Sequence, residues 1–391
     1  MSPSHGVAAP GSTASLRTAN QQRVLDVLRV GPDDGGTAEA FTQAELARAT
    51  GLAPATVSNI VRELVGAQLV QTDPGRGRRG SAVRLARTAG LVGGVDFGHS
   101  HVAVAIGDLT GAVLAEERRP LETGHRHEEG IELADRMLGE LAEALGDVRR
   151  IGLGLPAPVT NGVVRATAIL PGWEGVDAEK AAEAAFGTPV HVENDANLGA
   201  LAEHRRGVGR GHDTSVFVKI SSGVGAGIII DNQLFHGSSG SAGEIGHLTL
   251  DDQGPLCRCG SRGCLEAYTS VGTVQAMMAD QLPGAAFDEI VEAARTGNVS
   301  AQRTLEDAGL HLGWALASIV NLINPAVVVV GGDMARAGDL LLESARIGMR
   351  RHALDTVAAT PLLASTLGER ASLVGAVLLA AERTELIAPT G

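Results

Sequence analysis

Aromatic residues and cysteines are both scarce in this 391-residue chain, and each shortage narrows the possible folds. Aromatics make up only 2% of the sequence, so any core must be built mainly from Ala, Val, Leu and Ile. Hydrophobic residues still reach 44%, which supplies large cores and argues against a disordered chain. The three cysteines are an odd number, which argues against a disulfide framework and favours a metal site or reactive thiols.

Long hydrophobic runs are also missing. The longest apolar stretch, from Trp314 to Gly332, is interrupted by Asn324 and Pro325, and no run of 18 apolar residues occurs. The first 19 residues lack the apolar segment of a secretory signal. We therefore expect a cytoplasmic protein with no membrane partner.

Positive charge is scarce outside the N-terminal end. Up to Gly90 the chain has ten arginines, no lysine and seven acidic residues, a net charge of +3. The remainder carries 22 basic and 38 acidic residues, a net charge of −16. A basic segment joined to an acidic body indicates a nucleic-acid-binding module attached to a second unit.

The first ninety residues have the pattern of a winged helix-turn-helix domain, over residues 19–88, behind a flexible tail of residues 1–18. Thr42 and Glu45 form a capping box, and a second helix begins at Pro54. Two short strands then surround an arginine-rich turn, as in a wing. The alternative is a plain three-helix domain with a solvated loop. We expect contacts to double-stranded DNA from Thr56, Ser58, Asn59 and Arg62 on the helix and Arg76, Arg78 and Arg79 in the wing.

From about residue 90, predicted strands and helices alternate, which is typical of an α/β fold. Asp96 and Gly98 lie at a strand turn, where a carboxylate can approach a metal-bound phosphate. Asn194 and Asp195 follow another strand, where they can cap a helix or present a carboxylate to a ligand hydroxyl. The alternating glycines of residues 223–227 can cradle phosphate or simply close a tight hairpin.

The most specific local pattern is a histidine followed by three closely spaced cysteines. His247, Cys257, Cys259 and Cys264 offer one imidazole and three thiolates, which can complete a tetrahedral zinc site. The alternative is that the cysteines are small buried hydrophobic residues. Their spacing within eight residues, with interleaved glycines, favours metal.

Taken together and in this order, the motifs resemble those of the ROK family of repressors, open reading frames and sugar kinases. The N-terminal domain is similar to that of the repressor branch. The motifs that carry the resemblance are Val95-Asp96-Phe97-Gly98, Glu193-Asn194-Asp195, Gly223-Val224-Gly225-Ala226-Gly227, Glu244-Ile245-Gly246-His247 and Cys257-x-Cys259-Gly260-x-x-Gly263-Cys264-Leu265-Glu266.

The resemblance implies an actin-like sugar kinase fold (ribonuclease H-like) with two lobes around a sugar cleft. Residues 89–194 with 375–391 would form the first lobe, and residues 195–374 the second lobe with the zinc site and an oligomerisation surface. Zinc would be structural. The implied sugar ligands are Asn194, Asp195, Glu244, His247 and Glu266. In family kinases the residue matching Asp195 is the general base, and Asp96, Gly98, Gly223 and Gly225 match positions that serve ATP and magnesium.

The first phosphate loop departs from the kinase pattern. Family kinases usually have Asp-x-Gly-Gly-Thr-Lys there, whereas His99, Ser100 and His101 follow Gly98 in this chain. This departure argues against ATP and magnesium use. The sequence therefore predicts a homodimeric or homotetrameric repressor of carbohydrate genes, released by a sugar or sugar-phosphate effector. The alternatives are an ATP-dependent hexose kinase carrying a DNA-binding domain and, more weakly, a zinc-stabilised adaptor that binds a protein.

Overall fold

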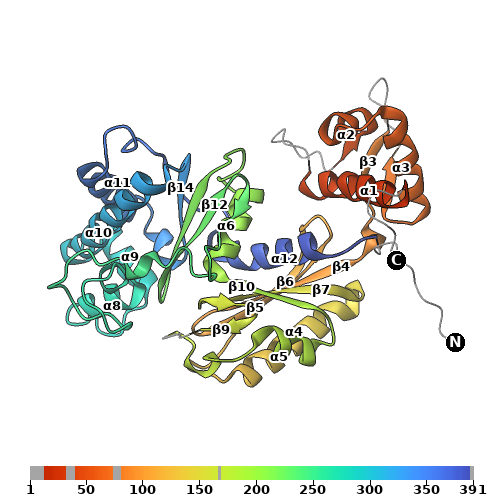
Figure 1. The fold of residues 1–391 in the computed structure, drawn as a ribbon. Helices are drawn as coiled ribbons and strands as arrows, with labels where there is room; N and C mark the ends of the chain where they lie inside the picture. Colours follow the sequence, from red (N-terminus) through yellow and green to blue (C-terminus); the bar gives the residue numbers. More distant parts are fainter. Residues whose placement is uncertain (1–12, 32–39, 74–80, 166–168, 388–391) are drawn as a thin grey trace.

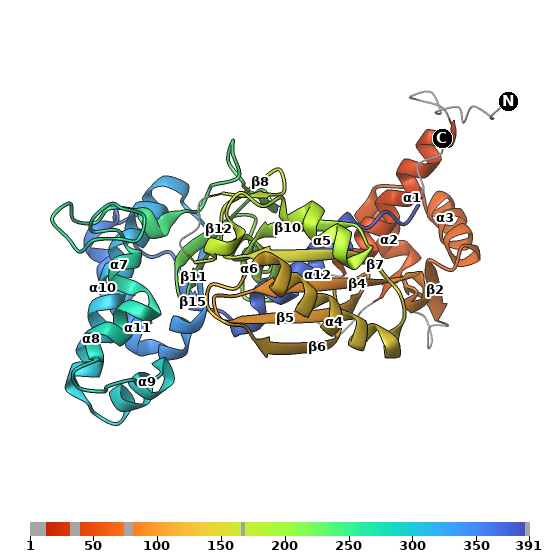
Figure 2. The ribbon, with the colours of Figure 1, turned by 90° about the horizontal axis from the view of Figure 1, so that it is seen from below.

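The computed structural model describes residues 13–31, 40–73, 81–165 and 169–387, which form three regions (Figure 1). The N-terminal region lies at one end of the molecule. Two lobes, each built on a five-stranded sheet, make up the rest, and both views place helix α10 at the end farthest from the N-terminal region (Figure 2). None of the helices in these ranges is long and apolar enough to cross a membrane.

The N-terminal region is a three-helix unit with a small antiparallel sheet of order β1-β3-β2. Leu25, Leu46 and Val57 are fully buried in its core. The helix-turn-helix and the two wing strands occur where the sequence predicts them, and a short strand β1 joins them. The elements are α1 (Thr13–Val30), β1 (Phe41–Thr42), α2 (Gln43–Thr50), α3 (Pro54–Gly66), β2 (Val70–Asp73) and β3 (Ala82–Leu85).

Helix α1 begins earlier than the composition predicts. Residues 13–18, expected in the flexible tail, belong to this helix, while residues 1–12 lie outside the described ranges. The Glu63 carboxylate on α3 accepts hydrogen bonds from Arg17 (3.0 Å) and Gln21 (2.8 Å) of α1. This contact between helices far apart in sequence stabilises the first turns of α1, and composition alone does not reveal it.

The first lobe has a sheet of order β10-β7-β4-β5-β6. Strands β4, β5 and β6 form an antiparallel meander, and β7 and β10 run parallel to β4. Helices α4 and α5 cover one face of this sheet (Figure 2). The elements are β4 (Leu91–Phe97), β5 (His101–Asp108), β6 (Val113–Pro120), α4 (His127–Leu145), β7 (Val148–Leu155), β8 (Val159–Thr160), β9 (Val163–Val164), α5 (Ala178–Phe186) and β10 (Val190–Asn194).

The second lobe repeats this topology. Its sheet has the order β13-β12-β11-β14-β15, with an antiparallel meander of β11, β12 and β13 and parallel strands β14 and β15. The elements are α6 (Asp195–Arg206), β11 (Ser215–Ile220), β12 (Val224–Ile230), β13 (Gln233–Leu234), η3 (Ile245–His247), α7 (Glu266–Thr269), α8 (Val271–Met278), α9 (Phe287–Arg295), α10 (Val299–Ile323), β14 (Val327–Gly331), η4 (Asp333–Ala337), α11 (Asp339–His352) and β15 (Leu362–Ala364).

The last helix, α12 (Ala371–Arg383), runs from the space between the lobes toward the N-terminal region (Figure 1). It crosses the first sheet at Gly152, where a Cβ would lie 2.0 Å from the carbonyl oxygen of Ala376. It crosses α6 at Gly375, where a Cβ would lie 2.0 Å from the carbonyl oxygen of Leu198. Glycine is required at both crossings because the backbones approach too closely for any side chain. Helix α12 is therefore tightly packed against both lobes.

Candidate functional site

A cleft of about 1100 Å³ lies where the two sheets face each other. Because the sheets have the same topology, the turn after β4 and the turn after β11 both contribute to it. Every residue that the sequence analysis assigned to sugar or nucleotide lines this one cleft. These residues are Asp96, Gly98, Asn194, Asp195, Gly223, Gly225, Glu244, His247 and Glu266.

Two glutamates mark one side of the cleft. Glu266 starts α7 and accepts hydrogen bonds from the Val224 amide (3.1 Å) and from Nε of Arg258 (3.3 Å). Glu244 immediately precedes η3. Burial, with the carboxylates of Asp195 and Glu266 nearby, raises the pKa of Glu244 from 4.5 to about 7. A carboxyl group that titrates near neutral pH is suited to pair with ligand hydroxyls as donor or acceptor.

Strand β10 ends at Asn194 and helix α6 begins at Asp195, and these two residues have different roles. The Asn194 side-chain oxygen accepts from the amides of Ala196 (2.9 Å) and Asn197 (3.2 Å), so it caps α6. Asp195, the first residue of α6, is 7% exposed and turns into the cleft. The structural role therefore falls to Asn194 and leaves the Asp195 carboxylate available to the cleft.

A lysine that the sequence analysis did not single out lies beside this aspartate. Nζ of Lys219, on β11, is 2.7 Å from Oδ2 of Asp195 and donates to Oγ of Ser372 (3.0 Å). Ser372 in turn donates to the Asp195 carbonyl oxygen at 2.9 Å. The available sequence signal is a single charged residue inside the apolar strand Ser-Val-Phe-Val-Lys-Ile. A charge in a strand that is otherwise buried indicates a partner in the fold.

The turn after β4 forms the opposite side of the cleft. Asp96 is 3% exposed, and its Oδ1 has no hydrogen-bond partner among the described residues. A Cβ on Gly98 would lie 2.1 Å from Cε1 of His101, so the imidazole covers this glycine. Burial, and then the charges of Arg118 and Lys219, lower the pKa of His101 to about 4. The ring is therefore neutral at pH 7 and packs where a phosphate would need open backbone.

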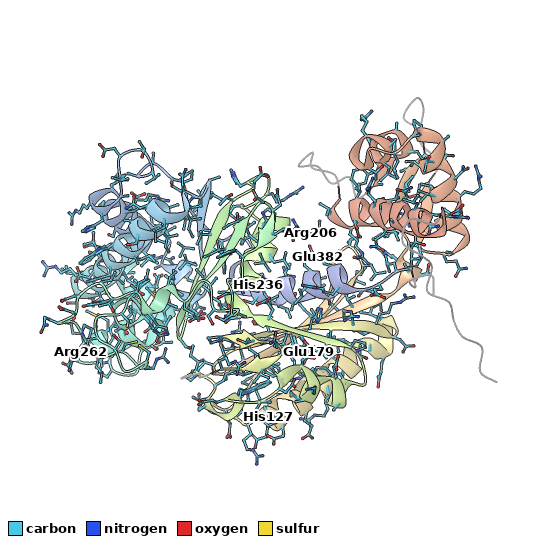
Figure 3. The ribbon with its side chains drawn as sticks, in the orientation of Figure 1. His127, Glu179, Arg206, His236, Arg262 and Glu382 are labelled. Atoms are coloured by element: carbon cyan, nitrogen blue, oxygen red, sulfur yellow. The ribbon has the colours of Figure 1, made fainter. Side chains whose placement is uncertain are left out.

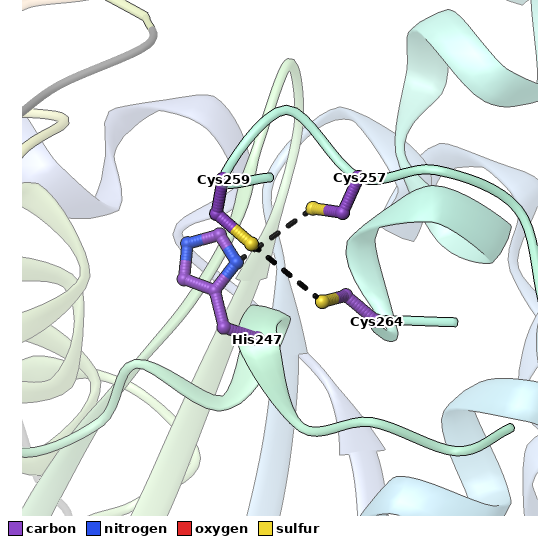
Figure 4. A group of neighbouring side chains, drawn as sticks. All are labelled: His247, Cys257, Cys259 and Cys264. Carbon is purple, nitrogen blue, oxygen red and sulfur yellow. Dashed lines mark hydrogen bonds between the residues drawn. The ribbon is translucent and has the colours of Figure 1, made fainter. Parts of the chain in front are cut away.

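The predicted metal ligands converge. The nitrogen and sulfur atoms of His247, Cys257, Cys259 and Cys264 all lie within 4.8 Å of one another (Figure 4). Two sharp turns bring them together. Gly260 has φ +90°, and at Gly263, with φ +61°, a Cβ would lie 1.6 Å from the Asp251 carbonyl oxygen. Only glycine can adopt these turns without strain.

The donor set and its spacing fit zinc. A Zn–S bond of about 2.3 Å in a tetrahedron places two sulfurs about 3.8 Å apart. Sγ of Cys259 lies 3.8 Å from Sγ of Cys264, and Sγ of Cys257 lies 3.8 Å from Nδ1 of His247. Burial raises the pKa of the Cys264 thiol to about 12 in the absence of metal. Since zinc binds thiolate, metal binding would release protons from such thiols.

The N-terminal region places the helix residues that the sequence analysis assigned to DNA contacts on α3. Thr42 and Glu45 form the capping box of α2, with the Glu45 amide donating to Oγ1 of Thr42 at 3.2 Å. On α3, Asn59 and Arg62 are exposed and Arg62 donates to Oδ1 of Asn59 at 3.2 Å, while Thr56 and Ser58 are partly exposed. The wing arginines Arg76, Arg78 and Arg79 lie outside the described residues.

Comparisons with known proteins agree with this geometry. A family model described as the ROK family matches residues 92–383, and one described as the MarR family matches residues 17–79. The xylose repressor of Bacillus subtilis is 27% identical over 369 residues, covering 92% of this chain and 94% of the relative. Two solved structures extend the comparison to the fold.

A ROK family transcriptional regulator, a homologue of the E. coli Mlc protein, superposes with a TM-score of 0.76 at 26% identity, over 93% of this chain and 96% of that one. A ROK family glucokinase from Streptomyces griseus, solved with glucose and AMPPNP, superposes with a TM-score of 0.67 at 31% identity, over 75% of this chain and all of that one. The actin-like sugar kinase fold and the winged helix that precedes it are therefore as predicted. The part of this chain without a counterpart in the kinase includes the winged helix.

Proposed function

The chain belongs to the ROK family, and we propose that it is a transcriptional repressor whose operator affinity falls when a sugar or sugar phosphate binds in the cleft. A winged helix precedes the family domain, and a relative matched over nearly its whole length is a xylose repressor. An effector changes DNA affinity only if it binds two states of the protein with different affinity. The proposal therefore needs a physical link between the cleft and the winged helix.

Helix α12 is that link, and it is the observation that carries the proposal. At its first turn, Ser372 contacts both Lys219 and Asp195 in the cleft. Its 13 residues span about 20 Å, at about 1.5 Å per residue. Further along, Val377 and Ala380 are buried in the same hydrophobic cluster as Val24 and Leu25 of α1. One rigid helix thus joins the ligand-binding residues to the core of the winged helix.

A buried arginine strengthens the far end of this link. Arg29 of α1 is 8% exposed and donates to the carbonyl oxygens of Glu382 (3.3 Å) and Thr384. Figure 3 shows Glu382 at the end of α12 that faces the N-terminal region. The last carbonyls of a helix lack partners within it and carry its negative dipole end, so a guanidinium there is favourable. A shift of α12 would be transmitted directly to α1.

The same proposal assigns roles to the zinc site, the oligomer and the two lobes. Zinc held by His247, Cys257, Cys259 and Cys264 would stabilise the loop that carries His247 and Glu266 into the cleft. A homodimer or homotetramer would place two winged helices on an operator with two-fold symmetry, with half-sites separated by whole helical turns. Residues 89–194 would move as one lobe and residues 195–370 as the other, with α12 between them.

The test of the link uses operator titrations of the full chain with a panel of monosaccharides and sugar phosphates. Arg29→Met should still bind the operator but lose most of the sugar response, because the contact between α1 and α12 is broken. Arg23→Met is the matched control, since Arg23 is an exposed arginine on the same helix. Equal sugar responses in both variants would refute α12 as the link, and a parent protein that responds to no sugar would refute the proposed function.

DNA recognition has its own test. Asn59 can pair with base edges, so Asn59→Ala should weaken binding to the operator by roughly 1–3 kcal/mol and leave non-specific binding nearly unchanged. Replacement of one wing arginine that contacts phosphate should weaken binding to every duplex and reduce the salt slope by about 1. Equal loss on specific and non-specific duplexes in Asn59→Ala would argue against base recognition by α3.

A second function, ATP-dependent hexose phosphorylation, is favoured by one observation. Asp96, Asp195 and Gly223 line the cleft as they would in a kinase of the family, and the structurally similar glucokinase was solved with glucose and AMPPNP. A coupled assay over common hexoses and pentoses decides between the two. Turnover that disappears in Asp195→Asn would establish the kinase function, whereas no turnover together with a sugar response supports the repressor alone.

A further inference from the structure

The chain has only two lysines, and they lie in opposite environments. The Lys180 side chain is 83% exposed and pairs with Asp177 on the surface. The Lys219 side chain is 19% exposed and lies in the cleft. In a protein that otherwise uses arginine for nearly all its positive charge, a lysine at this position calls for a physical reason.

The Lys219 ammonium is held by one carboxylate and one hydroxyl. It contacts Oδ2 of Asp195 at 2.7 Å and Oγ of Ser372 at 3.0 Å. Burial by itself would lower the pKa of Lys219, but the negative charges of Asp195 and Asp96 outweigh burial and raise it. The amine therefore stays protonated, and its charge partly offsets the burial that raises the pKa of Asp96.

A divalent metal ion and this ammonium would compete for the same ligands. Magnesium requires oxygen ligands at about 2.0–2.1 Å in octahedral geometry, which carboxylates supply in nucleotide-binding clefts. Two positive centres between the same carboxylates repel each other strongly in a partly buried site. With Lys219 in place, a positive charge of the chain itself already pairs with Asp195, so the residues present fit a magnesium–nucleotide complex poorly.

A second, independent observation also argues against a bound nucleotide: the glycine turn at Gly98 is covered. The His101 imidazole packs over Gly98, at the turn where a phosphate would need to approach the backbone. The low pKa of His101 keeps the ring neutral at pH 7, so it adds no charge that would attract phosphate. Both the metal position and the phosphate position on this side of the cleft are thus filled by side chains of the chain itself.

We propose that Lys219 is the resident cation of the cleft, taking the place of a divalent metal ion beside Asp195, so that ligand binding requires neither nucleotide nor magnesium. Asp195 then has one carboxylate oxygen engaged by the ammonium and one left to accept a ligand hydroxyl. Its role changes from proton acceptor to binding residue. The sugar nature of the ligand rests on the proposed function, but the exclusion of metal does not.

Manganese, a paramagnetic substitute for magnesium, tests this on the full chain. Free Mn²⁺ measured by electron paramagnetic resonance should show that Lys219→Met gains one site about tenfold tighter than any in the parent, because a repelling charge is removed. Lys180→Met should bind like the parent. Lys219→Met combined with Asp195→Asn should lose the gained site. Equal Mn²⁺ binding by a folded Lys219→Met and the parent would overturn the proposal.

A second measurement uses the parent protein, so the proposal can still be tested if Lys219→Met fails to fold. Labelling with ¹⁵N-lysine yields signals from two Nζ groups only, and the enclosed Lys219 ammonium should give a slowly exchanging one at neutral pH. Mn²⁺, with or without ATP, should leave that signal sharp, and broadening would show the ion entering beside Lys219 and refute the inference. If the signal stays sharp but no sugar alters operator affinity, the proposed function fails while this inference stands.

Discussion

The two sides of the cleft use similar residues for different purposes. On one side, the buried Glu266 and the half-buried Glu244 line the cleft together with His247 and Cys259 of the histidine and cysteine cluster. On the side of Asp96, Lys219 pairs with Asp195, and His101 covers the glycine turn. The difference teaches that, within a fold shared with sugar kinases, one side of the cleft can keep open carboxylates while side chains fill the other side.

Loss of the metal site should have the largest effect on the protein. The metal ligands adjoin only the side of the cleft that carries Glu244 and Glu266, so only that side loses its structural support. Cys259→Ser should lower bound zinc from one per chain to less than about one-tenth, because the tetrahedral set loses one of its four ligands and a serine hydroxyl is not among the usual zinc ligands. Cys259 is exposed, so the change leaves no cavity. Metal analysis of purified protein is the measurement, with Ser261→Ala in the same loop as control. Undiminished zinc in Cys259→Ser would refute the assigned ligand set.

The next largest effect is a difference in sugar binding between variants of two glutamates, Glu266 and Glu369, that line opposite sides of the cleft. Glu266→Ala should weaken sugar binding by roughly 1–3 kcal/mol, because a buried hydroxyl loses its acceptor, while operator binding without sugar stays intact. Glu369→Ala is the matched control, since Glu369 lines the other side and pairs with Arg118 and Arg336. Calorimetry on both variants decides. Equal losses would show that the two sides do not differ as described.

The smallest predicted effect is on pH dependence. The raised pKa of Glu244 means that the fold favours its protonated form, so this group stabilises the protein below about pH 4.5 and loses that contribution as the pH rises to about 7. Sugar affinity should change in the opposite sense, rising by up to about tenfold between pH 6 and pH 8, because the carboxylate is the stronger acceptor. Glu244→Gln should flatten the profile, and an unchanged slope in that variant would exclude Glu244 as the titrating group.

The sequence predicts best what is local. Spacing alone indicates the cluster of His247 and three cysteines, and apolar patterns in the sequence coincide with β11 and α9. Strand β6 was missed because it is a charged edge strand, Val-Leu-Ala-Glu-Glu-Arg-Arg-Pro, whose alternation is hidden by residues that favour helices. Strand β12 begins at Val224, so Gly225 belongs to a strand that was expected to be a loop.

What the sequence could not predict depends on distant partners. The contact between Lys219 and Ser372 joins residues 153 positions apart, and that between Arg29 and Thr384 joins residues 355 apart. No periodicity or motif reports such pairs, because they are created when α12 packs across both lobes. The residues that distinguish the two sides of the cleft, and the link from it to the DNA-binding region, therefore emerge only in the folded chain.

The most direct test of the central claim is an operator titration of the parent protein with a panel of monosaccharides and sugar phosphates, measured by fluorescence anisotropy with and without magnesium and ATP. The account predicts that at least one of these ligands lowers operator affinity, by the same factor whether or not magnesium and ATP are present. A response that appears only with magnesium and ATP, or the formation of a phosphorylated sugar during the titration, would contradict it.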